Sequence, residues 1–259
     1  IEGDVGSKET IKKILDLDGI DIICHLAGQS SGEKSFFDPL TDNQHNLLST
    51  LGIIEICNFF RVKKIINASS MSIYGDLKNP ANEKNDPPNP KSIYGQNKFT
   101  SEKYLSILLP NVPVLNFRMF NVYGPGQCLK DMKQGMVSIF IAMALKDKEI
   151  KVKGSLNRIR DFIYIDDVIN FWYKAINLEF SSQINVNLGT GKGTKISKLI
   201  NIIKDNISTN LKIKILDPTP CDQFQIYACN KKLLNLFGNY EFKELKNGID
   251  QFIKYAQEN

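Results

Sequence analysis

The sequence predicts an α/β protein built on a doubly wound parallel sheet, with a smaller α/β part toward the C-terminus. Short apolar runs typical of buried strands alternate with amphipathic segments of helix length through most of the 259 residues. The composition is that of a globular protein, with 42% hydrophobic and 24% charged residues. No apolar run reaches the ~18 residues of a membrane-spanning helix, so a membrane-spanning protein is not predicted. Apolar residues recur along the whole chain, so long disorder is not predicted either.

The expected elements follow one another in a regular alternation. Apolar runs predict strands, and amphipathic spacing of helix length predicts helices. Strands are predicted at 20–26, 63–68, 112–117 and 184–188, and helices at 42–60, 92–109, 137–145 and from about residue 196. A stretch rich in Asn, Pro, Asp and Gly over 74–90 predicts turns. Later elements are shorter and more mixed, so a functional break is expected near 120–150.

Charge, cysteines and histidines exclude several classes of function. The formal charge is +5, but only four of the 33 basic residues are arginines and the lysines are scattered, so a nucleic-acid surface is not predicted. The five cysteines form no C-x-x-C pair, and the two histidines join no cysteine cluster, so we expect no disulfide framework and no metal site. Because no targeting pattern opens the sequence, the cytoplasm is the expected location.

Tyr94 and Lys98 are the strongest candidates for chemistry. They are four residues apart on a predicted helix and share one face. A nearby ammonium stabilises a phenolate, so such a pair suits a general base. The same spacing occurs in Tyr74–Lys78 and Tyr227–Lys231. Context favours Tyr94, because it opens a helix, follows a strand that ends in Ser69-Ser70, and precedes Gly95, which we expect to let a ligand approach.

Three other features have a functional and a structural interpretation, and the residues alone leave both open. Ser70 either shares a hydrogen bond with a substrate hydroxyl or caps a turn, and no Gly-x-Ser-x-Gly elbow makes it a nucleophile. His25 is a candidate base, although a histidine in an apolar strand is more often structural. The glycine-rich segment 189–193 follows a strand and precedes a helix, but its third glycine is misplaced for a dinucleotide loop.

Several short motifs occur in the order found in one known family and cover nearly the whole chain. They are Gly3-Asp4-Val5, His25-Leu26-Ala27-Gly28, Asn46, Ser69-Ser70, Tyr74-Gly75, Tyr94-x-x-x-Lys98, Arg118-x-Phe120-Asn121-Val122-Tyr123-Gly124-Pro125-Gly126, Arg160-Asp161-Phe162-Ile163-Tyr164-Ile165-Asp166-Asp167-Val168 and Asn187-Leu188-Gly189-Thr190-Gly191. On these motifs the chain resembles the extended short-chain dehydrogenases/reductases, namely the NAD-dependent epimerase/dehydratase family and its UDP-galactose (UDP-glucose) 4-epimerase-like members.

The resemblance implies a Rossmann-type fold, with a partial NAD-binding domain at 1–125 and a mainly substrate-binding part at 126–259 that sends elements back to the first domain. It implies NAD as cofactor, a nucleotide sugar as substrate, no metal, and a homodimer, since the family is often dimeric. The catalytic residues would be Ser70, Tyr94 and Lys98. The cofactor would contact Asp4, Val5, Leu26, Ala27, Gly28, Asn46, Ala68, Ser69, Tyr94, Lys98 and Phe120, and the substrate Ser70, Asn121 and Arg160.

In the mechanism that the resemblance implies, Tyr94 as a phenolate takes the proton of the sugar O4 hydroxyl while hydride passes from C4 to NAD, and hydride then returns to the other face of the 4-keto sugar. Met71 and Ser72 stand where dehydratases of the family carry Asp-Glu, so dehydration and decarboxylation are disfavoured. Thr219-Pro220-Cys221-Asp222 stands where Arg-Pro-Gly-Asp is usual. We therefore expect Arg160 to be the principal cation on the diphosphate, with Lys151 or Lys153 beside it.

Two alternatives to an epimerase stay open. One is a reductase of the same fold that uses NAD(P)H to reduce a 4-keto sugar; the other is a non-catalytic NAD-binding scaffold, which the intact Ser70, Tyr94 and Lys98 disfavour. The family's Gly-rich turn, which holds the cofactor pyrophosphate, has no counterpart before Asp4. We therefore expect a natural start before Ile1, a whole protein of about 310–320 residues, and weak or no NAD binding by the 259 residues alone.

Overall fold

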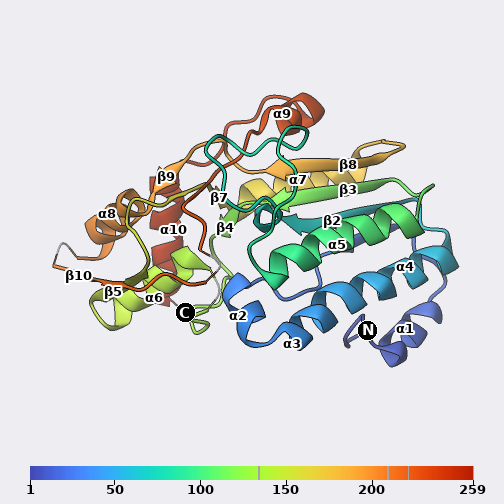
Figure 1. Cartoon of the computed structure of the whole chain (residues 1–259), viewed down its shortest axis with the longest axis horizontal. Coiled ribbons are helices and arrows are strands. Elements are labelled where there is room, and N and C mark those ends of the chain that lie inside the picture. Colours follow the sequence, from blue (N-terminus) through green and yellow to red (C-terminus); the bar gives the residue numbers. More distant parts are fainter. Residues whose placement is uncertain (134, 209, 221, 259) are drawn as a thin grey trace. The chain divides into compact units, whose positions relative to one another are not determined.

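The computed structural model describes residues 1–133, 135–208, 210–220 and 222–258, which form two compact units (Figure 1). The first unit comprises Ile1–Gly75, Glu83–Met119 and Trp172–Val186, and the second comprises Asp76–Asn82, Phe120–Phe171 and Asn187–Asn259. Each unit is therefore assembled from segments that are distant in sequence. The functional domains expected at 1–125 and 126–259 stay a prediction.

The first unit is built on a four-stranded sheet with the order β1–β2–β3–β8. β1 (Ile22–His25) and β3 (Val114–Met119) pair in parallel with β2 (Lys64–Ser70), which is buried along its whole length, and β8 (Gln183–Leu188) follows β3. Asn67 Nδ2 donates to Asn116 Oδ1 across the sheet (2.7 Å). The predicted parallel sheet is confirmed, and the strands expected at 20–26, 63–68, 112–117 and 184–188 are all present.

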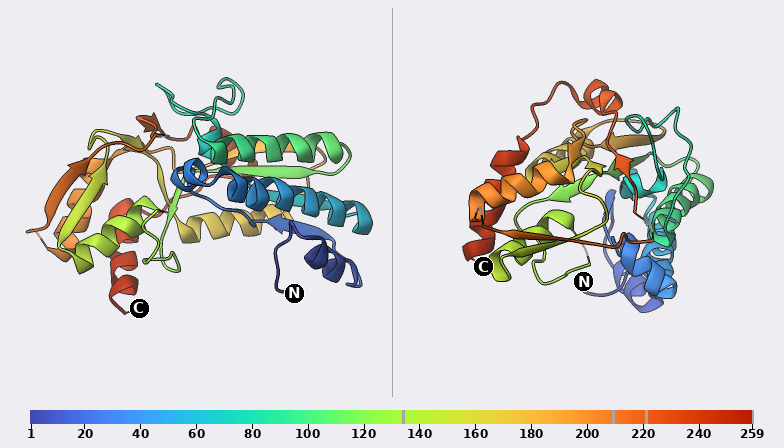
Figure 2. Two further views of the ribbon diagram at one scale, coloured as in Figure 1. Left: turned by 60° about the horizontal axis from the view of Figure 1, so that its bottom comes forward. Right: turned by 60° about the vertical axis from the view of Figure 1, so that its left-hand side comes forward.

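Helices cover both faces of this sheet. α4 (Ser49–Phe60) and α5 (Ile93–Leu108) lie on one face, and the part of α7 (Ile165–Asn177) that belongs to this unit, from Trp172 on, lies on the other (Figures 1 and 2). The apolar residues of α4 pack with those of β1 and β2 in one buried cluster that includes Ile53, Ile23 and Ile65. The remaining elements of this unit are α1 (Lys8–Leu15), α2 (Gly32–Phe37), α3 (Pro39–Asn43), η1 (Gln44–Leu48) and the 3₁₀ turn η2 (Met71–Ile73).

The helix expected at 42–60 is present but not uniform. It begins in α3, passes through the π-helical segment η1 and continues as α4. A π-helical segment is rare and is often found at functional sites. Here it carries Asn46, one of the residues predicted to contact the cofactor.

The second unit combines three small sheets with helices that enclose their own core. Phe140 and Ile141 of α6, Ile200 of α8 and Phe252 of α10 are buried together in it. Among the described residues the sheets are β4 with β7, β5 with β10, and β11–β6–β9. The elements are β4 (Asn121–Tyr123), α6 (Met136–Lys146), β5 (Glu149–Lys153), β6 (Ile159–Arg160), β7 (Phe162–Tyr164), β9 (Thr194–Lys195), α8 (Ile196–Ile207), β10 (Lys212–Leu216), β11 (Gln225–Ile226), α9 (Lys231–Phe237) and α10 (Leu245–Glu258). Within the described ranges, no helix has the length and apolarity to cross a bilayer.

A buried ion pair joins α5 to the ends of two strands. Arg118 of β3 donates to both carboxylate oxygens of Glu102, from Nε (3.0 Å) and Nη2 (2.7 Å), and its Nη1 donates to the Tyr74 hydroxyl (2.9 Å). Arg118 and Glu102 are only 3% and 5% exposed. Ser69, at the end of β2, donates to the same carboxylate. Helix and sheet are thereby fixed together at the carboxyl edge of the strands, where ligands bind in such folds.

We predict that Glu102→Gln lowers the free energy of unfolding by about 3–5 kcal/mol, because it leaves the buried Arg118 charge without its counter-charge. Urea denaturation measures the change. The control is Glu9→Gln, which breaks the exposed pair between Glu9 and Lys13 (2.6 Å) and is expected to have little effect. Equal small losses from both variants would contradict the role given to the buried pair.

Candidate active site

Helix α5 carries two of the predicted catalytic residues, and its start is fixed by local contacts. The Ser92 hydroxyl caps the helix by accepting a hydrogen bond from the N–H of Gly95 (3.0 Å). A Cβ atom at Gly95 would lie 3.0 Å from the carbonyl carbon of Ser72 and closer still to its oxygen, so only glycine lets the helix approach η2 this closely. The expected reason for Gly95 is therefore corrected: Ser72 of the chain itself, and not a ligand, fills the space beside it.

Ser70 has the structural role considered from the sequence, and its contact with a substrate hydroxyl stays a prediction. Its hydroxyl accepts a hydrogen bond from the N–H of Ser72 (3.1 Å) and so caps η2. The same side chain is hydrogen-bonded to Tyr94. The carboxyl end of β2 therefore places a hydroxyl directly beside the phenol of α5.

Burial dominates the electrostatics of Tyr94 and Lys98. Burial raises the pKa of Tyr94 to about 12, the Asp42 carboxylate acts in the same direction, and the hydrogen bond with Ser70 opposes them. Burial also lowers the pKa of Lys98 to about 8, against the attraction of Asp42. The expected lowering of the phenol pKa by Lys98 does not outweigh burial here, since the ammonium lies 6.0 Å from the ring centroid. At neutral pH the site therefore holds a phenol and an ammonium.

Asp42 is a member of this site that the sequence did not single out. Its carboxylate is 1% exposed, accepts a hydrogen bond from Asn97 Nδ2 (2.7 Å) and contacts the Gln29 amide. It acts electrostatically on both Tyr94 and Lys98. In the sequence, Asp42 is only an acidic residue near the start of a predicted helix. Such residues are common because they interact favourably with the helix dipole, so the position gives little sign of a function.

The carboxyl end of β1 forms a cradle that fits a bound cofactor. Leu26, Ala27 and Gly28 follow the strand and are exposed, and Gly28 has a φ of +151°. A Cβ atom at Gly28 would lie 2.6 Å from Asn46 Oδ1 and 3.3 Å from Lys98 Nζ. Asn46 donates to the carbonyl of Gln29 (3.2 Å), but its buried Oδ1 has no hydrogen-bond partner among the described residues. An orphaned acceptor and an ammonium beside an exposed glycine fit a polar cofactor such as NAD.

The other residues expected at the cofactor lie in both units. Ala68 and Ser69 are buried in β2, and Val5 packs against the core of the first unit. The Asp4 carboxylate is exposed and accepts a hydrogen bond from the N–H of Gly6 (2.9 Å). Phe120 belongs to the second unit, where its N–H donates to the carbonyl of Leu188 (3.0 Å).

The residues expected at the substrate diphosphate belong to the second unit. Asn121 Nδ2 donates to the carbonyl of Asp161 (3.0 Å), and Arg160 forms an ion pair with Asp222 (3.1 Å). Of the segment that departs from the family pattern, Thr219 and Asp222 are described, whereas Cys221 lies outside the described residues. Arg158, which the sequence did not single out, pairs with the same carboxylate (2.6 Å).

The glycine-rich segment 189–193 surrounds a carboxylate of the protein itself. Asp161 accepts hydrogen bonds from the N–H groups of Thr190 (3.0 Å) and Gly191 (2.9 Å) and from the Thr190 hydroxyl (2.6 Å). Ala228 donates to it as well (3.1 Å). Burial raises the pKa of Asp161, and these four donors oppose the shift. Because the donors that would hold a phosphate are engaged by Asp161, the structural interpretation of this segment is the better one.

His25 is buried in β1 and has the environment of a structural residue. Its Nε2 is hydrogen-bonded to Thr50 Oγ1 (3.3 Å), and its Nδ1 has no partner in the part of the chain that the structure describes. Burial, assisted by the positive charge of Lys98, lowers its pKa to about 3. The imidazole therefore stays neutral at physiological pH.

Comparison with known proteins identifies the family. The NAD dependent epimerase/dehydratase family matches residues 1–189. The chain belongs to this family. A Methanocaldococcus jannaschii protein with the provisional name UDP-glucose 4-epimerase is 31% identical over 262 residues, which span 100% of this chain and 84% of that protein. The crystal structure of UDP-glucose 4-epimerase from Thermotoga maritima, with UDP-glucose, is 27% identical, has a TM-score of 0.91, and is matched over 100% of this chain and 84% of that one.

The epimerase/dehydratase family also contains relatives with a different reaction. An Escherichia coli protein named dTDP-4-dehydro-6-deoxyglucose reductase is 32% identical over 195 residues, which cover 74% of this chain and 61% of that protein. The predicted family, the Rossmann-type α/β fold and NAD as the family's cofactor are confirmed. The chain is thus an enzyme of an NAD-dependent family whose members act on nucleotide sugars.

We predict that His25 destabilises the protein in acid. Between its ordinary pKa of 6.5 and its folded value of about 3, the unfolded chain binds a proton that the folded chain does not, so stability falls as pH falls. Relative to His25→Asn, the wild-type protein should lose about 2 kcal/mol of unfolding free energy between pH 7 and pH 5. Urea denaturation at both pH values measures the difference, with His45→Asn as the control, and an unchanged difference would refute the prediction.

Proposed function

We propose that this protein is an NAD-dependent nucleotide-sugar 4-epimerase that works by transient oxidation of C4, with Tyr94 as the base. The observation that carries the proposal is the buried hydrogen bond between Ser70 and Tyr94, with the Lys98 ammonium one helical turn farther along α5. Such a pair of hydroxyls recognises one substrate hydroxyl from two sides. A proton acceptor and a hydride acceptor at one site are what oxidation of an alcohol to a ketone needs.

Ser70 and Tyr94 would hold the O4 hydroxyl of the sugar, and Tyr94 would take its proton. The high pKa of Tyr94 means that a phenolate forms only when positive charge comes near it. Lys98, which its pKa of about 8 keeps protonated at neutral pH, holds one positive charge in the site, and the further charge would come with a bound ligand. On the return step the Tyr94 hydroxyl gives the proton back to O4 of the inverted sugar.

Asn46, Gly28 and Lys98 would hold the nicotinamide half of NAD, with Leu26 and Ala27 along its path. NAD bound there would supply the hydride acceptor and donor that oxidation and renewed reduction of C4 require. The residues of the chain orient the reactants and manage the proton. The buried Asn46 Oδ1, which has no partner among the described residues, gains one when a cofactor amide or hydroxyl lies against Gly28.

The residues after Ser70 favour epimerisation over dehydration. Elimination of water from a 4-keto sugar needs an acid and a base close to the sugar carbon that loses the hydroxyl. Met71 and Ser72 form η2 at this point and provide neither. The proposed substrate is therefore a sugar that keeps all its hydroxyls, carried on a nucleoside diphosphate that Asn121 and an arginine beside Asp222 would contact. A homodimer in the cytoplasm stays the expected state.

A 4-keto sugar reductase is the second candidate, supported by the Escherichia coli relative named as a reductase. The same Ser70, Tyr94 and Lys98 would then donate a proton to O4 while reduced cofactor is consumed. The two reactions differ in their stoichiometry. A reductase oxidises one cofactor for each turnover, whereas an epimerase leaves the total of oxidised and reduced cofactor unchanged.

We predict that Tyr94→Phe and Lys98→Met each lower kcat for interconversion of the nucleotide sugars by about 10²-fold or more, as expected for loss of a general base or of the charge that supports it. The substrates to assay with the complete protein are UDP-glucose, UDP-N-acetylglucosamine, UDP-glucuronate and GDP sugars. The phenylalanine and methionine side chains are close in size to the tyrosine and lysine that they replace. The unfolding midpoints of both variants should therefore stay near that of the wild-type protein.

Tyr227→Phe is the matched control for this test, since Tyr227 and Lys231 repeat the four-residue spacing in the second unit. It should keep wild-type turnover. Full activity of Tyr94→Phe together with an inactive Tyr227→Phe would show that the wrong tyrosine has been chosen. An active Lys98→Met would remove the lysine from the proposed mechanism.

A further inference from the structure

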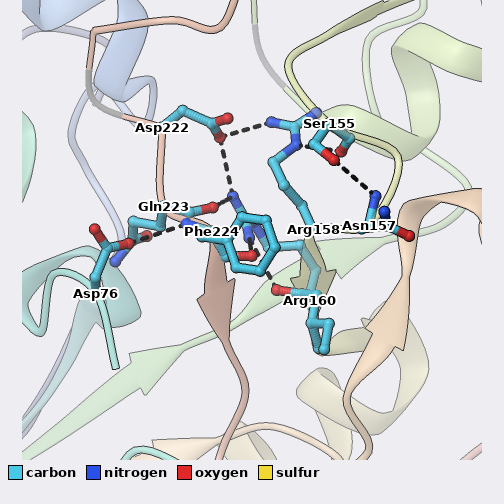
Figure 3. Close-up of polar contacts among 9 residues, drawn as sticks. Asp76, Ser155, Asn157, Arg158, Arg160, Asp222, Gln223 and Phe224 are labelled. Carbon is cyan, nitrogen blue, oxygen red and sulfur yellow. Dashed lines mark hydrogen bonds and ion pairs between the residues drawn. The ribbon is translucent and has the colours of Figure 1, made fainter. Parts of the chain in front are cut away.

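Two arginines of the second unit converge on one carboxylate (Figure 3). Asp222 Oδ1 accepts from Arg158 Nη1 (2.6 Å) and from Arg160 Nη2 (3.1 Å). Both arginines are only 5% exposed. Two guanidinium groups at one buried place repel each other, and burial with this repulsion lowers the pKa of Arg160 to about 10 against the attraction of Asp222 and Asp76. A further anion would stabilise the pair.

The terminal nitrogens of Arg160 donate all their hydrogen bonds to other groups of the protein. Its Nη1 donates to the carbonyls of Ile159 (2.8 Å) and Phe224 (3.4 Å), and its Nη2 donates to Asp222 and to the carbonyl of Gln223. All four terminal hydrogens are therefore engaged, and only the Nε hydrogen is left. Arg160 anchors the segment 222–224 beside β6, and it offers little to an incoming ligand.

Arg158 presents the opposite pattern. Its Nε donates to the carbonyl of Ser155 (3.0 Å) and its Nη1 to Asp222, which uses two of five donors. The other three, including both hydrogens of Nη2, have no acceptor in the described ranges. Gly154 shapes the turn around this group: its φ is +80°, and a Cβ there would lie 3.3 Å from Arg158 Cζ and 2.7 Å from Asp222 Oδ2. The guanidinium is thus held in place, with three donors that have no hydrogen-bond acceptor among the described residues.

We propose that Arg158 supplies the cation that position 219 lacks, binding the diphosphate of the nucleotide sugar through the donors left without an acceptor, while Arg160 anchors the segment 222–224. This inference rests on the proposed function, because it takes the substrate to be a nucleotide sugar. A planar arginine fork matches two phosphoryl oxygens, whereas the lysines expected to assist, Lys151 and Lys153, are exposed point charges on β5. Arg158 is thereby a residue that binds the diphosphate of the substrate.

The test is calorimetric titration of the protein with UDP, GDP and dTDP, using the nucleotide that the wild-type protein binds best. Arg158→Met should weaken that binding by about tenfold or more, since hydrogen bonds to a charged partner are lost. Arg61→Met, which removes the same charge from an exposed position after α4, should leave it unchanged. Arg158→Lys keeps the charge that pairs with Asp222 and loses the fork, so it should fold normally and bind several-fold more weakly than the wild-type protein.

The outcomes separate this inference from the proposed function. Binding of none of the three nucleotides by the wild-type protein would overturn the proposed function itself. Tight wild-type binding that neither Arg158→Met nor Arg158→Lys weakens would overturn only the role of Arg158. UDP-glucose and UDP-glucuronate are titrated alongside, and a loss confined to UDP-glucuronate would mean that the arginine meets a sugar carboxylate, which also overturns the diphosphate assignment.

Discussion

The bidentate ion pair between Arg118 and Glu102 is the contact on which the first unit's site depends. Glu102 stands four residues after Lys98 and eight after Tyr94, so all three lie along one stripe of α5. Because Arg118 and Ser69 hold the Glu102 carboxylate, the stripe is pinned to the ends of β3 and β2. Ser70, the neighbour of Ser69, is thereby brought against Tyr94. The geometry of the proposed chemistry thus follows from a charge pair that takes no part in it.

The burial that this packing imposes sets the protonation states in the site. Removal from water disfavours the charged form of each group, which raises the pKa of the Tyr94 phenol and lowers that of the Lys98 ammonium. Asp42 favours the ammonium and disfavours the phenolate. In the free site the proton therefore stays on the Tyr94 hydroxyl. Positive charge that arrives with a ligand favours loss of that proton. The buried cation and the hydroxyl pair are in place before any ligand binds.

Patterns that are local in sequence predicted the fold and the core of the site. Apolar runs predicted the strands of the sheet, and helical spacing predicted α5 with Tyr94 and Lys98 on one face. Features that depend on the approach of distant segments were not predictable in this way. Gly95 is needed because η2 packs against it, Asp42 matters because α3 packs beside α5, and the two arginines differ because one is enclosed by 222–224. None of these contacts has a counterpart in the spacing of neighbouring residues.

The central claim is that C4 of the sugar is oxidised and reduced again by a cofactor that stays in the site. Single-turnover conversion of a nucleotide sugar that carries deuterium at C4 tests it most directly, with mass spectrometry and NMR of the product. If hydride leaves C4 and returns to its other face, the epimeric product keeps the deuterium at C4 while the medium gains none. Loss of the label to water, or its recovery in released reduced cofactor, would contradict the account.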